Sequence, residues 1–251
     1  MSAGGREGVA RLVPLMLAGP AGALEALLQE REGFAHQVTA VVCHPHPLYG
    51  GTLHNKVAHR VASALFALDV AVLRFNFRGV GKSAGVYDSG IGELEDARCA
   101  LRELEQRFPH ARRWCAGFSF GSWVAARLAA SEPSIERLLM VAPGVHTQTF
   151  EELLSLAIPK VIVQGMGDEI CRPENLLRVY PTWAEPKRLI QVPEASHSST
   201  SSWRNWVTPC MKPWPGQSEG RLEVLLEVPQ PLAAGCSAPH ERTKSACTPS
   251  R

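Results

Sequence analysis

The sequence contains no apolar run long enough to cross a bilayer and no strong excess of charge of either sign. A membrane-spanning helix needs about 20 consecutive apolar residues, and polar or charged residues interrupt every hydrophobic segment of this chain. The formal net charge is only +2, from 26 basic and 24 acidic residues. This balance favours neither nucleic acid nor an anionic membrane surface. We therefore expect no nucleic-acid and no membrane partner.

Paired cysteine motifs are also missing. The seven cysteines are scattered and form no CxxC pair, which argues against a zinc ribbon or a thioredoxin-like motif. We interpret Cys43, Cys99 and Cys115 as buried thiols in a reducing compartment, so we predict a cytoplasmic location. The short N-terminal apolar run is interrupted by Pro14 and is a poor secretion signal. A β-hairpin turning at residues 19–22 is the better interpretation of this segment.

Strand and helix patterns alternate between residues 38 and 193. Short apolar runs predict strands at 38–43, 70–75, 114–118, 138–142, 159–164 and 188–192. Apolar residues recur at helical spacing in 52–68, 94–108 and 123–130. This alternation implies an α/β fold, with a mostly parallel, doubly wound sheet and helices on both faces.

The strongest chemical signal is the segment Gly117-Phe118-Ser119-Phe120-Gly121. It matches G-x-S-x-G and lies where a predicted strand gives way to a helix, as the nucleophile turn of α/β-hydrolases requires. The turn is so tight that its two glycine positions, 117 and 121, have no room for side chains. Ser119 is therefore the candidate nucleophile, and the N–H of Phe120 is a candidate donor to an oxyanion.

A nucleophilic serine needs a base, and the base needs an acid to orient it. In this fold the acid and then the histidine follow the serine along the chain. Asp168 and His197 each follow a later predicted strand and satisfy this order. Glu169 is the rival acid and Glu194 a more distant one.

The loop after the strand at 38–43 reads His44-Pro45-His46-Pro47-Leu48-Tyr49-Gly50-Gly51. It should supply the second oxyanion donor, and prolines cannot donate. We expect the N–H of His46 to serve, with that of Leu48 as the second choice. Histidines 44, 46 and 54 also suggest a metal, but this set has no nearby carboxylate and is a poor one, so we expect no metal site and no cofactor.

A second glycine-rich segment, Gly79-Val80-Gly81-Lys82-Ser83, resembles the end of a P-loop. The P-loop pattern requires a glycine at the position that Asn76 occupies. The segment also opens no clear helix. We expect a turn beside the active site here, and nucleotide binding is the weaker alternative.

Together, the segments 44–51, 74–83 and 117–121 resemble a group of small bacterial α/β-hydrolases near the dienelactone-hydrolase and serine-aminopeptidase-like branches. The resemblance runs from about Leu12 to His197. It implies Ser119, Asp168 and His197 as a catalytic triad. In that group the turn before the acid usually reads Gly-Asp-x-Asp, and Met166 replaces its first Asp here, which favours Asp168 over Glu169. The short gap between the strands at 138–142 and 159–164 implies that no cap domain is present.

The chain departs from that group after His197. The group continues with Phe-Phe and a closing amphipathic helix, whereas this chain has Ser198-Ser199-Thr200-Ser201-Ser202. Residues 198–251 also hold three of the six tryptophans and three of the seven cysteines. We expect a hydrolase domain over 1–197, incomplete at its end, and a divergent, disordered tail over 198–251. A frameshift after the His197 codon is one explanation and a genuine divergent tail is the other; the nucleotide sequence decides between them.

The sequence thus predicts a serine hydrolase that cleaves an ester, thioester or amide of a small soluble substrate through an acyl-enzyme. The alternative is a binding protein that keeps the fold but has impaired catalysis.

Overall fold

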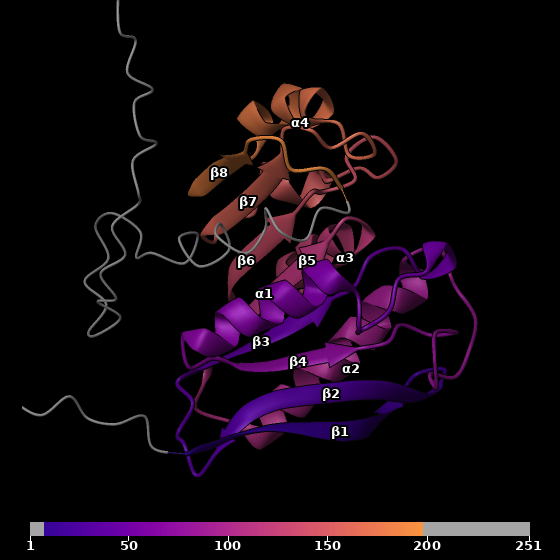
Figure 1. The fold of residues 1–251 in the computed structure, drawn as a ribbon, viewed down its shortest axis with the longest axis vertical. Coiled ribbons are helices and arrows are strands. Elements are labelled where there is room, and N and C mark those ends of the chain that lie inside the picture. Colours follow the sequence, from indigo (N-terminus) through magenta and orange to yellow (C-terminus); the bar gives the residue numbers. More distant parts are fainter. Residues whose placement is uncertain (1–7, 198–251) are drawn as a thin grey trace, which may run out of the picture. The chain divides into compact units, whose positions relative to one another are not determined.

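The computed structural model describes residues 8–197, which form one eight-stranded sheet (Figure 1). The strand order is β1-β2-β4-β3-β5-β6-β7-β8. The strands are β1 (Val9–Gly19), β2 (Gly22–Glu32), β3 (Val38–Cys43), β4 (Ala71–Phe75), β5 (Arg112–Phe118), β6 (Ile135–Val141), β7 (Lys160–Gly165) and β8 (Lys187–Val192). Strands β3 to β8 are parallel, and β2 pairs antiparallel with both β1 and β4.

The N-terminal β-hairpin is confirmed, with Gly19 opposite Gly22 at its turn. Strand β2 alternates buried with partly exposed side chains and turns Leu24, Ala26 and Leu28 toward the core. This period of two is what a strand with one covered face requires. Strand β1 forms the outer edge of the sheet, and its Arg11 pairs with Glu30 at 2.7 Å.

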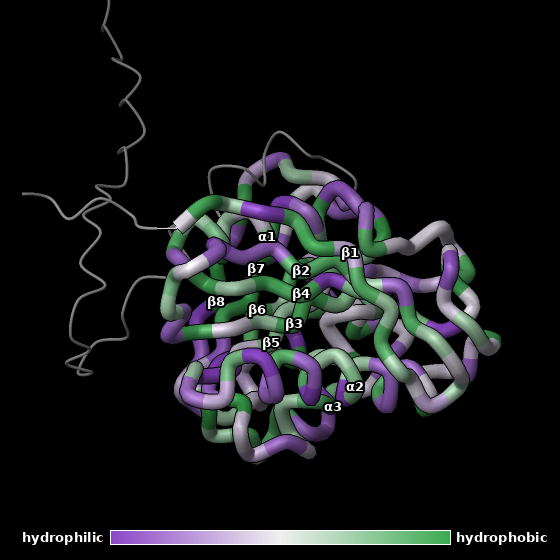
Figure 2. Tube along the Cα trace, turned by 90° about the horizontal axis from the view of Figure 1, so that it is seen from below, coloured by the Kyte–Doolittle hydropathy of each residue, from purple (hydrophilic) through white to green (hydrophobic). Residues whose placement is uncertain are grey.

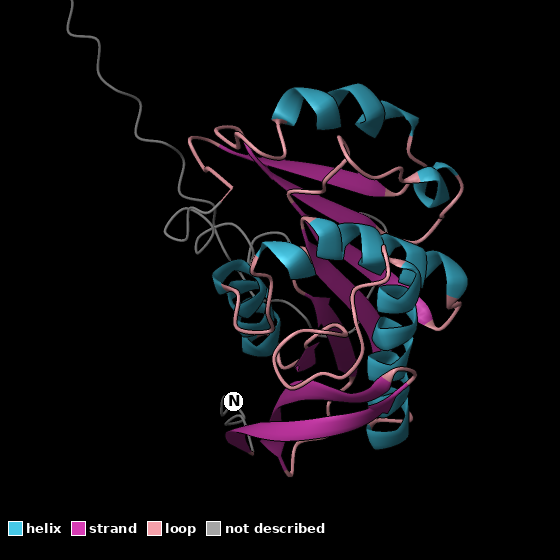
Figure 3. Ribbon diagram, turned by 90° about the vertical axis from the view of Figure 1, so that its right-hand side faces the viewer, coloured by secondary structure: helices cyan, strands magenta, loops and turns pink. Residues whose placement is uncertain are grey.

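Helices cover both faces of the sheet (Figure 3). On one face α1 (Lys56–Ala67) packs its apolar stripe against residues of β3, β4 and β5. On the other face lie α2 (Ile91–Arg107), α3 (Phe120–Ser131) and α4 (Pro173–Val179). The strands therefore form a hydrophobic layer between helices (Figure 2), and β3 is buried along its whole length, as expected of a strand covered on both faces.

Helix α1 begins later than its apolar pattern predicted, at Lys56 rather than Thr52. Asn55 caps it by accepting hydrogen bonds from the N–H groups of Val57 (2.9 Å) and Ala58 (3.2 Å). Residues 52–55 instead form a turn closed by the bond from the Asn55 N–H to the Thr52 carbonyl, 2.9 Å long. The cap fixes the helix start and frees residues 52–55 to line the region above the sheet.

The predicted fold class is confirmed: a mostly parallel, doubly wound sheet with helices on both faces. Between β6 and β7 the regular structure is a single 3₁₀ helix, Glu151–Leu154, so no cap domain is inserted there. Two expectations were incomplete: helix α4 was not predicted, and Cys99 is only half-buried, unlike Cys43 and Cys115. No helix within residues 8–197 is long and apolar enough to span a membrane. The predicted tail, 198–251, lies outside the described residues.

Candidate active site

Ser119 sits at the carboxyl end of β5, in the turn that starts α3. Its backbone has φ 54° and ψ −118°, a region that side-chain-bearing residues rarely adopt. The Ser119 N–H donates to the Val141 carbonyl at 2.9 Å, and the Ser122 N–H donates to the Ser119 carbonyl at 2.9 Å. These bonds from a neighbouring strand and from the helix hold the strained turn in place.

The two glycines of the motif allow this turn to pack closely. A Cβ on Gly117 would lie 2.0 Å from the carbonyl oxygen of Gly121. A Cβ on Gly121 would lie 2.3 Å from the Cys43 carbonyl oxygen, at the end of β3. Both contacts are far below van der Waals distance, so only glycine fits either position. The motif therefore brings the start of α3 directly against the loop that follows β3.

The sheet order explains why these two loops meet. The chain leaves β3 toward β4 on one side, and β5 flanks β3 on the other. At such a reversal of strand order the loops diverge and leave a crevice at the carboxyl ends of the strands. The loop after β3 and the Ser119 turn after β5 flank this crevice.

The loop after β3 keeps one amide free near Ser119. The Leu48 N–H donates to Nδ1 of His46 at 3.2 Å, and the N–H groups of Tyr49 and Gly51 donate to the His46 carbonyl, each at 3.1 Å. Leu48, our second choice as oxyanion donor, is therefore already committed. No hydrogen bond within residues 8–197 uses the N–H of His46 or that of Phe120.

His44 anchors this loop from below and is fully buried. Its Nε2 accepts the Phe77 N–H at 3.1 Å, and its Nδ1 donates to the Pro45 carbonyl at 2.7 Å. Burial lowers the pKa of His44 to about 4, although the bond to Pro45 opposes the shift. His44 is therefore a neutral structural group in this fold at neutral pH. Histidines 44, 46 and 54 form no metal cluster within the described residues.

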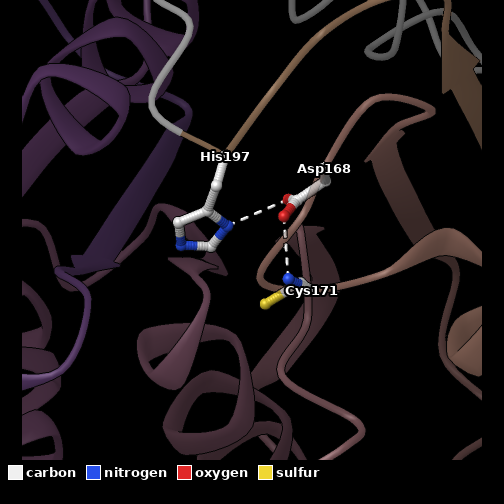
Figure 4. Close-up of side chains that lie close together, drawn as sticks. All are labelled: Asp168, Cys171 and His197. Atoms are coloured by element: carbon white, nitrogen blue, oxygen red, sulfur yellow. Dashed lines mark hydrogen bonds and ion pairs between the residues drawn. The ribbon is translucent and has the colours of Figure 1, made fainter.

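Asp168 and His197 meet as the sequence predicted (Figure 4). Asp168 follows β7, His197 follows β8, and His197 Nδ1 lies 2.9 Å from Asp168 Oδ2. The other oxygen, Oδ1, accepts the N–H groups of Ile170 (3.0 Å) and Cys171 (2.7 Å). The carboxylate is buried and fully used, so Nδ1 donates to it and Nε2 of the neutral ring is left unprotonated.

The rival acids lie elsewhere. Glu169 and Glu194 are both exposed to solvent, and no hydrogen bond joins either of them to His197 within residues 8–197. The side chain of Asp168 turns inward because its Oδ1 closes the turn over Ile170 and Cys171. The choice between adjacent acids is thus made by local backbone hydrogen bonds.

The imidazole of His197 packs on the Phe118 ring, with a centroid distance of 4.8 Å. Phe118 precedes Ser119, so the ring is held beside the nucleophile turn. Within residues 8–197, the hydrogen-bond partner of Ser119 Oγ is the Cys171 thiol at 3.8 Å, and no hydrogen bond joins Ser119 to His197. Such bonds are often long in enzymes without substrate and shorten in the complex.

Cys171 is a residue that sequence reasoning missed. It lies three positions after Asp168 in a stretch with no regular pattern, so only the tertiary structure brings it to Ser119. Burial raises the pKa of its thiol to about 12. The group is therefore a protonated, weak hydrogen-bonding neighbour of the hydroxyl and not a second nucleophile.

Asp168, Cys171 and His197 also offer ligand atoms within 4.8 Å of one another, the arrangement of a possible metal site (Figure 4). A metal ligand set needs a thiolate and free lone pairs. Here the thiol is protonated, and both Asp168 oxygens already accept hydrogen bonds. These residues fit a hydrogen-bonded acid and base better than a metal.

Ser119 and His197 line one pocket of about 480 Å³. This volume is within the range of small-molecule sites. The pocket is bounded by Pro45, His46, Tyr49, Thr52, His54, Asn55, Lys56, Val57, Phe118, Ser119, Ile170 and His197. The structure thus brings both candidate reacting side chains and the His46 loop to one cavity.

Comparisons with known proteins agree with this fold. A family model described as serine aminopeptidase, S33, matches residues 36–152. An α/β serine hydrolase homologue from Coxiella burnetii is 37% identical, with a TM-score of 0.76, and the alignment covers 80% of this chain and 97% of that one. A protein from Xanthomonas campestris, described as an α/β serine hydrolase without lid, is 35% identical, with a TM-score of 0.72 and coverage of 78% and 90%.

A curated relative from Rickettsia prowazekii is 42% identical over 141 residues. The match covers 55% of this chain and 59% of that protein. The matches to two Mycobacterium tuberculosis relatives cover 57% of their length. The chain thus spans less than two thirds of the length of these curated relatives.

Proposed function

The chain belongs to the α/β-hydrolase superfamily, and from this premise we propose that it is a serine hydrolase whose triad is Ser119, His197 and Asp168. The observation that carries the proposal is the 2.9 Å bond between His197 and Asp168, formed beside a strained serine turn in a shared pocket. Ser119 has a strained backbone and lies beside a histidine that a buried acid holds. This combination is typical of an activated nucleophile.

The reaction starts at the Ser119 hydroxyl. Its oxygen attacks the substrate carbonyl carbon while Nε2 of His197 takes the proton. The negative charge that develops on the carbonyl oxygen is stabilised by the free N–H groups of Phe120 and His46. Asp168 keeps the imidazole in the correct tautomer and stabilises the imidazolium, without itself taking the proton.

Collapse of the tetrahedral intermediate breaks the bond to the leaving group, which receives the proton from His197. A water molecule then attacks the acyl-enzyme, with His197 again accepting a proton and returning it to Ser119. Atoms and charges balance in each step without a metal or a redox cofactor. The proposed substrates are an ester, a thioester or an amide.

The open site favours small soluble substrates. No lid element lies between β6 and β7, and the similar Xanthomonas protein is described as lacking a lid. A lipase that works at an oil–water surface usually needs a mobile apolar cover. Strong activation by lipid droplets, with preference for long acyl chains, would contradict this part of the proposal.

The proposal is tested with the full chain and a fluorophosphonate probe, together with short p-nitrophenyl esters. We expect covalent labelling at Ser119 and hydrolysis of the esters, and neither in Ser119→Ala. Absence of labelling in well-folded wild-type protein would overturn the proposal and favour a binding protein with this fold.

A further inference from the structure

The pocket beside Ser119 has walls of different chemistry. The wall that carries the reacting groups is formed by Phe118, Ser119, Ile170 and His197. The opposite wall is formed by the loop after β3 and the start of α1, and it carries hydroxyl, imidazole and amide groups. Among residues 8–197, no aspartate or glutamate lines the cavity, and Lys56 is the one lysine or arginine in its lining. Within the described residues, the lining therefore offers a ligand a lysine and no carboxylate.

Lys56 is not neutralised by a neighbour in the described part of the chain. The side chain is exposed, and no carboxylate within residues 8–197 forms an ion pair with it. The first amides of α1 do not supply the same feature, because Asn55 already accepts hydrogen bonds from Val57 and Ala58. The lysine ammonium therefore adds a full positive charge that the capped amides of Val57 and Ala58 cannot supply.

Two carboxylates near the pocket, Asp168 and Glu25, already accept hydrogen bonds, and the exposed Glu169 is not among the lining residues. Asp168 lies behind His197 and accepts three hydrogen bonds. Glu25 lies in a neighbouring pocket, beyond His54, where it accepts the side-chain amide of Asn76 at 2.7 Å and the Lys82 N–H at 2.9 Å. An uncompensated cation in a pocket of this size selects an anionic group on the ligand, because the ligand then supplies the missing charge.

We propose that the substrate of this site carries a carboxylate and that Lys56 binds it while Ser119 attacks the ester carbonyl. The inference rests on the proposed function and adds a substrate class to it: acidic esters, such as half-esters of dicarboxylic acids or acyl esters of hydroxybenzoic acids. Lys56 is then a specificity-determining residue. Lys56 contacts the carboxylate equally in the ground state and in the transition state. Loss of this contact should therefore change mainly KM.

Two matched substrate pairs test this. In the first pair, the p-nitrophenyl half-ester of adipic acid carries a carboxylate on the acyl side, and p-nitrophenyl hexanoate lacks it. The second pair is 4-acetoxybenzoate and its methyl ester, in which the carboxylate is present or absent on the leaving-group side. The measured quantity is the ratio of kcat/KM for the acidic ester to that for its neutral partner.

We expect Lys56→Met to lower this ratio about fivefold in at least one pair, as for a partly exposed ion pair. Lys56→Glu should lower it further through repulsion, and Lys56→Arg should restore it. Added salt should lower the wild-type ratio toward that of Lys56→Met, because it screens exposed charges. Lys82→Met is the matched control, since it removes the same charge from the neighbouring pocket.

The two proposals fail in different ways. If wild-type protein hydrolyses none of the four esters, the proposed function is wrong. If it hydrolyses them but the ratio is the same in Lys56→Met, Lys82→Met and wild type for both pairs, the proposed function stands and the carboxylate inference is wrong. An equal fall in Lys56→Met and Lys82→Met would also overturn the inference, because net charge and not position would then explain it.

Discussion

Two glycine-rich turns of this molecule each carry a serine, and the environments of the two hydroxyl groups are opposite. In the turn at 117–121 the Ser119 hydroxyl lines a pocket, and the thiol of Cys171, 3.8 Å away, is its weak hydrogen-bond partner. In the turn at 79–83 the Ser83 hydroxyl is buried, donates to the Asn76 carbonyl at 2.8 Å and accepts the Glu25 N–H at 3.0 Å. The Ser119 hydroxyl faces the pocket, whereas the Ser83 hydroxyl both donates and accepts hydrogen bonds within the fold.

The difference teaches that glycine spacing alone does not identify a reactive turn. Both turns need glycine: a Cβ on Gly81 would lie 2.5 Å from the side chains of Asn76 and Glu25, and a Cβ on Gly121 would collide with the end of β3. The turn at 79–83 is followed by further loop and not by a helix, which removes the P-loop architecture. What separates the two turns is where each serine hydroxyl finds its hydrogen bonds.

The largest expected effect comes from the reactive turn. Ser119→Ala should lower kcat for p-nitrophenyl esters by on the order of 10⁴-fold or more, because the nucleophile of a working triad is lost. Its stability to urea should stay close to that of wild type, since Ser119 Oγ makes no strong hydrogen bond. Near wild-type turnover by the folded variant would remove Ser119 from the mechanism.

The acid that supports the reactive turn comes next. Asp168→Asn should lower kcat by on the order of 10³- to 10⁴-fold, because an amide cannot hold His197 in the tautomer that accepts a proton. Glu169→Gln is the matched control at the adjacent exposed position, and its turnover should equal that of wild type. Steady-state kinetics of both variants, after their folding is checked by circular dichroism, distinguish the two acids. A larger loss in Glu169→Gln would assign the role to Glu169.

The third prediction concerns His44, whose Nε2 accepts the Phe77 N–H just before the turn at 79–83. Burial lowers the pKa of His44 to about 4, below the ordinary value of 6.5. Because the folded-state pKa is the lower one, the unfolded chain binds the proton more tightly. The stabilisation is complete above pH 6.5 and is lost as the pH falls toward 4.

A shift of this size corresponds to about 3 kcal/mol of unfolding free energy. We expect urea unfolding of wild-type protein to show this loss between neutral pH and pH 4.5, and His44→Asn to be less stable at neutral pH with a weaker dependence on pH. His110→Asn, at an exposed position, is the control. Parallel pH curves for wild type and His44→Asn would contradict the role of His44.

Most of the fold could be predicted because its signals are local. The hairpin turn at residues 19–22 and the apolar runs of β3 to β8 needed no tertiary information. The start of α1 could not be found this way, since both backbone groups of Leu53 bond to distant residues: its N–H donates to Asn76 at 2.7 Å and its carbonyl accepts from Arg74 at 2.8 Å. These contacts draw the first residues of the helical pattern into a turn.

The candidate site shows the same limit. Motif order pointed to Ser119, Asp168 and His197, because each follows a strand of the parallel sheet. Three features depend on how loops fold against one another: the commitment of the Leu48 amide to the His46 ring, the thiol of Cys171 beside Ser119, and the lack of an ion pair between Lys56 and any residue of 8–197. No spacing in the sequence encodes them.

The smallest effect should come from the second turn, and it should appear in stability and not in catalysis. Ser83→Ala leaves the Asn76 carbonyl and the Glu25 N–H without their shared partner in a buried place. Such a loss costs about 1–3 kcal/mol. We expect this decrease in the free energy of unfolding by urea, with kcat of the folded fraction unchanged and no binding of ATP detected by calorimetry in either protein. A folded Ser83→Ala variant that loses turnover as Ser119→Ala does, or wild-type protein that binds ATP, would show that the turn at 79–83 has a chemical role and that the contrast between the two turns is wrong.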